Sequence, residues 1–137
     1  MPLCVAAGGL VVTLAVESFT VAWTHSIEKI RWEEDYKVSG AQLVLTEARV
    51  RGSGAGMEPP ADATFADGVW HYDPHLPPLN ELRLTQSSFT SGYDLCQRDQ
   101  CTPLTDFAPR AGNGDVIDLR PCGPSSARAP SNIERVR

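Results

Sequence analysis

His25 and Glu34 are the residues whose types and spacing best suit acid–base chemistry. Large apolar residues alternate over Phe19–Trp23, and His25 continues their phase, while Glu34 lies between Trp32 and Tyr36. If these two segments pair across a turn near residues 27–29, both polar side chains face the core and come near each other. A carboxylate beside an imidazole stabilises the charged form of each group, and such pairs are frequent at functional sites. The pair is therefore either a candidate site or a structural pair at a sheet end.

A glycine-rich loop provides a second candidate, for anion binding. Residues 52–57 read Gly-Ser-Gly-Ala-Gly-Met, so the backbone amides around Gly54 and Gly56 could converge on an anion, with Arg49 and Arg51 just before them. The loop lacks the third glycine of a dinucleotide fingerprint and the lysine of a P-loop. The alternatives are a carboxylate site, or a structural loop preceded by two surface arginines.

Two of the four cysteines, Cys96 and Cys101, flank a short polar segment that is typical of a hairpin. Facing each other across it, they either form a disulfide, which requires an oxidising compartment, or remain two thiols. A zinc site is disfavoured because the Cys-x4-Cys spacing lacks a second Cys or His pair.

The remaining sequence provides no recognisable metal or catalytic signature. His71 and His75 have a metal-ligand spacing with Asp73 between them, but Pro74 prevents a helix from presenting both on one face. The G-x-S-x-G and H-E-x-x-H motifs are absent from the sequence. We therefore expect neither a metal nor a cofactor.

These candidates must be positioned by β-strands, because apolar residues recur with a period of two and no helical stripe is evident. Gly8-Gly9, Ser39-Gly40 and Asp67-Gly68 predict turns. In the half-buried strand from Ile30 to Ser39, Glu33 and Asp35 have the opposite phase to Glu34 and are expected to be solvated. The expected strands span 3–7, 10–16, 19–24, 30–39, 42–50, 69–72, 81–85 and the two arms of the cysteine hairpin. The predicted fold is all-β, a single antiparallel sandwich or barrel-like domain of roughly eight to ten short strands.

Length and composition indicate one domain. The 137 residues have a net charge of −5, and residues 52–82 contain five acidic residues but no Lys or Arg. A chain without a basic stripe is not expected to bind nucleic acid. Residues 108–137 are rich in Pro, Gly, Ser and Arg, so we expect a domain over 1–107 and a mobile C-terminal extension over 108–137. The uncharged residues 1–16 lack a basic leader and are too short to span a bilayer, so we expect strands there and no membrane-spanning segment.

Several segments together resemble a family of small bacterial domains of unknown function. They are residues 19–28, with His25-Ser26-x-Glu28, and residues 32–36, 51–60, 70–72 and 95–104. The resemblance extends over roughly residues 3–106. Members of that family are typically encoded beside the subunits of tripartite ATP-independent periplasmic (TRAP) transporters. This resemblance implies an accessory role in organic-anion uptake, with the motif residues as candidates for a site.

Two functional hypotheses follow. The first is a non-enzymatic module that binds a transporter membrane subunit, a solute-binding subunit or a small organic acid near His25, Ser26, Glu34 and the glycine loop. The second is a small enzyme that acts on the transported compound, with His25 as general base oriented by Glu34. The lack of an export signal favours the cytoplasm, whereas the transporter context and a disulfide favour the periplasm.

Overall fold

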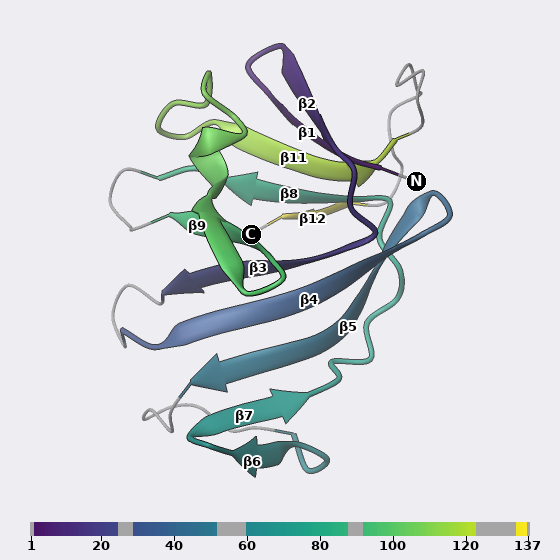
Figure 1. The fold of residues 1–137 in the computed structure, drawn as a ribbon, viewed down its shortest axis with the longest axis vertical. Coiled ribbons are helices and arrows are strands. Elements are labelled where there is room, and N and C mark those ends of the chain that lie inside the picture. Colours follow the sequence, from purple (N-terminus) through teal and green to yellow (C-terminus); the bar gives the residue numbers. More distant parts are fainter. Residues whose placement is uncertain (1, 25–28, 52–59, 88–91, 123–133, 137) are drawn as a thin grey trace.

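The computed structural model describes residues 2–24, 29–51, 60–87, 92–122 and 134–136, and these form two β-sheets (Figure 1). The larger sheet has seven strands in the order β10 (Gln100–Pro103), β9 (Tyr93–Gln97), β3 (Ser18–Thr24), β4 (Arg31–Ser39), β5 (Gln42–Arg51), β7 (Val69–Tyr72) and β6 (Thr64–Ala66). The smaller sheet has the order β12 (Glu134–Val136), β8 (Glu81–Thr85), β11 (Val116–Pro121), β1 (Leu3–Ala7) and β2 (Leu10–Leu14). A short 3-10 helix, η1 (Leu104–Asp106), follows β10.

One hydrophobic core joins the two sheets. Alternate side chains of β1, β8 and β11 contact alternate side chains of β3, β4, β5 and β9, as the period-two pattern requires. The fully buried members include Leu3, Leu82 and Ile117 from the smaller sheet and Val21 and Leu43 from the larger one. The all-β prediction is confirmed, as two layers of paired strands without barrel closure.

Local turn signals correctly placed the hairpins. Gly8 and Gly9 have φ angles of 59° and 80°, which lie in the left-handed region that glycine adopts without strain, and they connect β1 to β2. The cysteine hairpin likewise forms β9 and β10, with Cys96 directly opposite Cys101. All pairs among β1–β11 are antiparallel, and only β12 runs parallel to its neighbour β8.

The C-terminal part of the chain does not follow the expected boundary between a domain over residues 1–107 and an extension over residues 108–137. Strand β11 lies inside the smaller sheet, between β1 and β8, and both Ile117 and Leu119 are fully buried. Cys122, directly after β11, forms a disulfide with Cys4 of β1. Residues 116–122 therefore belong to the two-sheet domain, because long-range pairing with β1 and β8 holds them there.

None of the helices in the described ranges has the length and hydrophobicity needed to cross a membrane.

Candidate functional site

Charged side chains gather on the face of the seven-stranded sheet that points away from the core. A bulge in β5 puts them there, since Asp35 pairs with Glu47 and Tyr36 with Leu45, leaving Thr46 as an extra residue. Before the bulge, Leu43 and Leu45 point inward. In a strand without the bulge, Glu47 and Arg49 would lie on the same face as Leu43 and Leu45 and would point into the core. The bulge thus turns Glu47, Arg49 and Arg51 outward.

Arg49 is the centre of this charged group. Its guanidinium makes a two-pronged contact with Asp35, Nη1 to Oδ2 at 2.6 Å and Nη2 to Oδ1 at 2.7 Å. It also donates from Nη1 to Glu47 at 2.6 Å and from Nε to Glu33 at 3.1 Å. Thr20 of β3 donates its hydroxyl to Asp35 at 2.6 Å. Arg49 therefore connects three carboxylates from two neighbouring strands, and its three nitrogens are all engaged.

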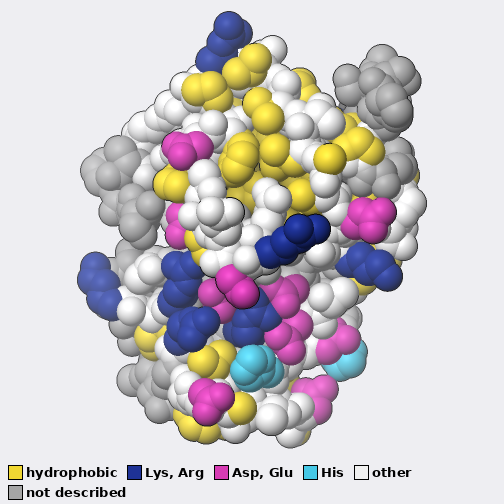
Figure 2. Space-filling model, in the orientation of Figure 1, with side chains coloured by type: hydrophobic (Ala, Val, Ile, Leu, Met, Phe, Trp, Pro, Cys, Tyr) yellow, Lys and Arg dark blue, Asp and Glu magenta, His cyan; other side chains and the backbone are white. Residues whose placement is uncertain are grey.

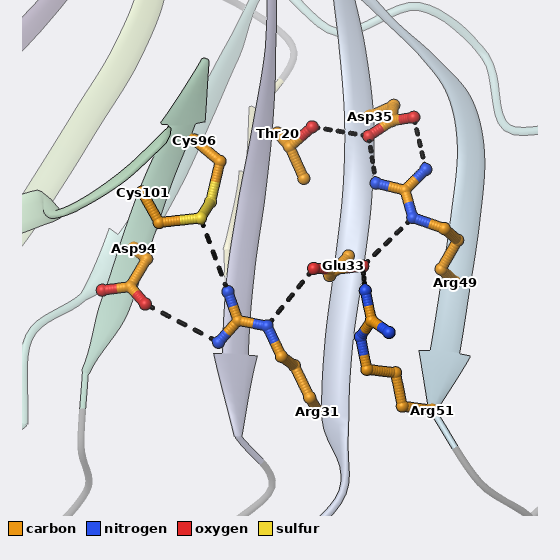
Figure 3. The surroundings of a disulfide bond; sticks show 9 residues. All are labelled: Thr20, Arg31, Glu33, Asp35, Arg49, Arg51, Asp94, Cys96 and Cys101. Atoms are coloured by element: carbon orange, nitrogen blue, oxygen red, sulfur yellow. Dashed lines mark hydrogen bonds and ion pairs between the residues drawn. A yellow bond between two sulfur atoms is a disulfide. The ribbon is translucent and has the colours of Figure 1, made fainter. Parts of the chain in front are cut away.

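Glu33 is held by three arginines and is only 8% exposed. Besides Arg49, it accepts hydrogen bonds from Arg51 Nη2 at 3.3 Å and Arg31 Nε at 3.2 Å (Figure 3). The prediction that Glu33 is solvated was wrong, because arginine side chains from β4 and β5 cover it. Asp35 is partly covered in the same way, with 31% of its side chain exposed.

These contacts fix the charge state of the carboxylates. Burial acts to raise the pKa of Glu33, but hydrogen bonds from Arg49 and Arg31 outweigh it, so this pKa lies below its ordinary value. Burial also acts to raise the pKa of Asp35, but hydrogen bonds from Arg49 and Thr20 outweigh this effect, so the pKa of Asp35 is lowered as well. Hydrogen bonding to Asp35 is the largest cause that raises the pKa of Arg49. Glu33, Asp35 and Arg49 therefore remain ionised at neutral pH.

A disulfide borders the charged group on its β9–β10 side. Cys96 and Cys101 are bonded, and Arg31 links this pair to Glu33, with Nη2 3.7 Å from Cys101 Sγ and Nη1 3.7 Å from Asp94 Oδ2 (Figure 3). Figure 2 shows basic and acidic side chains interleaved over the lower half of this face. An open cleft of about 570 Å³ lies there. Its lining is Thr20, Glu33, Asp35, Arg49, Arg51, Cys96, Arg98, Asp99 and Cys101.

The structure places the residues proposed from the sequence in different regions. Arg49 and Arg51 lie in the charged group, whereas His25, Ser26, Gly54 and Gly56 are outside the described residues. Glu34 points to the core side of β4, is 6% exposed, and accepts a hydrogen bond from the Tyr36 hydroxyl at 2.8 Å. The pairing of His25 with Glu34 therefore stays a prediction.

Glu34→Ala is expected to destabilise the fold by about 1–3 kcal/mol, because it removes the acceptor of a buried hydrogen bond. Urea denaturation at pH 7 measures this loss. The matched control is Glu17→Ala, which removes an exposed carboxylate and should change the free energy of unfolding by less than about 0.5 kcal/mol. Equal effects of the two substitutions would contradict the structural role of Glu34.

The two other histidines form no metal site with the described residues around them. His71 Nδ1 lies 3.4 Å from Glu47 Oε2, at the β7 side of the charged group. His75 contacts Asp62 and Asp73 on an exposed loop. No cluster of three metal-ligating side chains occurs within the described part of the chain.

The fold and the site together define a two-sheet β-protein with a charged cleft on its larger sheet. The chain belongs to the family described as "Domain of unknown function (DUF1850)", which it matches over residues 19–104, more than half of its length. The matched range contains the seven-stranded sheet except for Ser18, the first residue of β3, and it contains every residue of the charged group. No curated protein and no solved structure matches the chain.

Proposed function

We propose that this protein is a non-enzymatic binding module that takes a small organic carboxylate in the charged cleft and serves as an accessory of a TRAP-type organic-anion transport system. The observation that carries the carboxylate assignment is the state of Arg51. Its side chain is 51% exposed at the cleft, and its one hydrogen bond to a described residue is the 3.3 Å contact with Glu33. A guanidinium has five N–H donors, and among the described residues an acceptor engages only one nitrogen of Arg51, Nη2.

Arg49 and Arg51 have different roles in this proposal. Arg49 is engaged by Asp35, Glu47 and Glu33 and positions the group. Arg51 supplies a planar pair of donors that matches a carboxylate, and Arg98 adds a third arginine to the lining of the same cleft. Neutralisation of Glu33 and Asp35 by arginines reduces the repulsion that an incoming anion meets.

The transport assignment rests on the resemblance of residues 3–106 to domains encoded beside TRAP transporters. Two disulfides add support, because disulfides persist in oxidising compartments such as the periplasm, where the binding proteins of such transporters work. The partner in this proposal is a solute-binding or membrane subunit of the transporter.

Arg51→Gln tests the carboxylate assignment. Calorimetric titration of the full chain with a panel of mono-, di- and hydroxycarboxylates is expected to show saturable binding to at least one member. Arg51→Gln should weaken that binding at least tenfold, because it removes a charge-assisted contact. Arg110→Gln is the matched control, an exposed arginine that does not line the cleft, and should leave binding unchanged.

A second titration uses purified solute-binding and membrane subunits of a TRAP transporter. Binding to a subunit without binding to any acid would overturn the carboxylate assignment and keep the accessory role. The absence of binding in both panels contradicts the proposed function as a whole.

A further inference from the structure

The two disulfides of this protein lie in different environments. Cys4 of β1 and Cys122, directly after β11, are only 3% and 1% exposed. Cys101, by contrast, is exposed on β10, one of the two edge strands of the larger sheet, while its partner Cys96 is 7% exposed on β9. A dissolved thiol can therefore approach Cys101 but not the Cys4–Cys122 pair.

A positively charged side chain, Arg31, is held beside the exposed sulfur. Its Nη2 lies 3.7 Å from Cys101 Sγ, and Nε and Nη1 are held by Glu33 and Asp94, which fixes the guanidinium beside the sulfur. A neighbouring cation lowers the pKa of a thiol and stabilises the thiolate that forms when a disulfide opens. Cys101 Sγ is therefore both the sulfur that a dissolved thiol can reach and the one whose thiolate Arg31 stabilises.

We propose that Cys96–Cys101 is a thiol–disulfide exchange site for a dithiol partner, with Cys101 as the sulfur that forms the mixed disulfide. A thiolate of the partner attacks Cys101 Sγ, and the electron pair of the broken S–S bond leaves on Cys96 Sγ, which takes up a proton. The partner's second thiolate then attacks its own sulfur in the mixed disulfide, and Cys101 leaves as a thiolate beside Arg31. The partner loses two electrons and becomes a disulfide, and the protein gains a thiol at Cys96 and a thiolate at Cys101.

The fold can survive this reaction. Strand β9 is paired with β3 on its other side through residues 93–96, and β10 keeps its own ladder with β9. The ring closed by Cys96–Cys101 contains only four intervening residues. Opening it therefore frees little chain, whereas Cys4–Cys122 continues to tie β1 to the end of β11.

The first test treats the folded wild-type chain with graded dithiothreitol, a small dithiol, followed by alkylation and peptide mass spectrometry. Cys96 and Cys101 are expected to be labelled at concentrations that leave Cys4 and Cys122 bonded. Labelling of all four cysteines together, or of Cys4 and Cys122 first, overturns the proposal.

The second test separates the two sulfurs. Cys96→Ser leaves Cys101 as a free thiol, which should react with an aromatic disulfide at least tenfold faster than Cys96 does in Cys101→Ser. Adding Arg31→Gln to Cys96→Ser should slow the reaction about threefold at pH 7. Without the neighbouring cation the pKa of the thiol rises, and the loss of thiolate outweighs the accompanying gain in nucleophilicity. Adding Arg110→Gln instead should change nothing.

Equal rates at the two cysteines, or no effect of Arg31→Gln, would contradict the assignment. Circular dichroism establishes that each variant is folded, and the wild-type labelling order decides the question if a variant is not. Neither test involves a carboxylate, so its result is independent of the proposed binding function.

Discussion

Replacing Cys4 and Cys122 together by alanine is expected to lower the free energy of unfolding by about 5 kcal/mol. The two residues are 118 positions apart, so their bond closes nearly the whole described chain, and the chain-entropy model assigns about this value to a loop of that length. The bond also fixes Cys122, at the end of the central strand β11, against β1. Urea denaturation of the oxidised protein measures the loss.

The matched control is the double alanine variant at Cys96 and Cys101. That bond has a separation of five residues, for which the same model predicts only about 2 kcal/mol. Comparing the two variants keeps the number of removed sulfurs equal. Losses of similar size would mean that loop length does not determine the contribution of these disulfides.

Most strands could be predicted because their signals are local. Gly8-Gly9 and the alternation around Phe19–Trp23 specify hairpins and faces within a few residues, and β1–β5 begin and end close to the expected positions. Strand β11 was missed although Ile117 and Leu119 have the correct period. Its flanks are rich in Pro, Gly and Ser, and its partners β1 and β8 are distant in sequence. The composition of the flanking residues indicated an extension, whereas β11 is a strand that is stabilised by pairing with distant segments.

The candidate site was only partly predictable, for a similar reason. Arg49 and Arg51 stood out, but simple alternation assigned Glu33 and Asp35 to solvent. The sequence of β5 does contain a signal, because Leu43, Leu45 and Glu47 are spaced by two and would lie on one face of a regular strand, although the first two are apolar and the third is charged. Such a phase reversal predicts a bulge between them. Which carboxylate meets which arginine still depends on the register of β4 against β5, which no local pattern gives.

Arg49→Met is expected to destabilise the protein by about 2–3 kcal/mol at pH 7. The substitution keeps the aliphatic stem but leaves Glu33, Asp35 and Glu47 as close negative charges without their shared cation. Removing one partner of a fully buried ion pair costs about 3–5 kcal/mol, and the partial exposure of Asp35 and Glu47 reduces that value. Urea denaturation is again the measurement.

The effect of Arg49→Met depends on pH in a direction that the pKa shifts determine. The pKa values of Glu33 and Asp35 are lowered from ordinary values of 4.5 and 3.8, so their ionisation stabilises the folded wild type above those values. The wild type loses this stabilisation as the pH falls below 4.5 and then passes the lowered pKa values that Glu33 and Asp35 have in the folded protein. In the variant these pKa values rise, and acid instead relieves carboxylate repulsion. The difference in stability between wild type and variant should therefore shrink from pH 7 to pH 3.

Two further substitutions separate geometry from charge. Arg49→Lys keeps the positive charge but cannot form the two-pronged contact with Asp35, so it should restore only part of the stability. Lys37→Met removes an exposed cation from β4 and should have little effect at any pH. Full recovery with lysine, or a pH-independent loss with methionine, would contradict the assignment of Arg49 as the planar, charge-assisted link between β4 and β5. The expected pattern is that Arg49→Lys regains part of the stability and that wild type and Arg49→Met become similarly stable at low pH. This pattern follows only if the ionised carboxylates are stabilised by the planar geometry of Arg49 as well as by its charge.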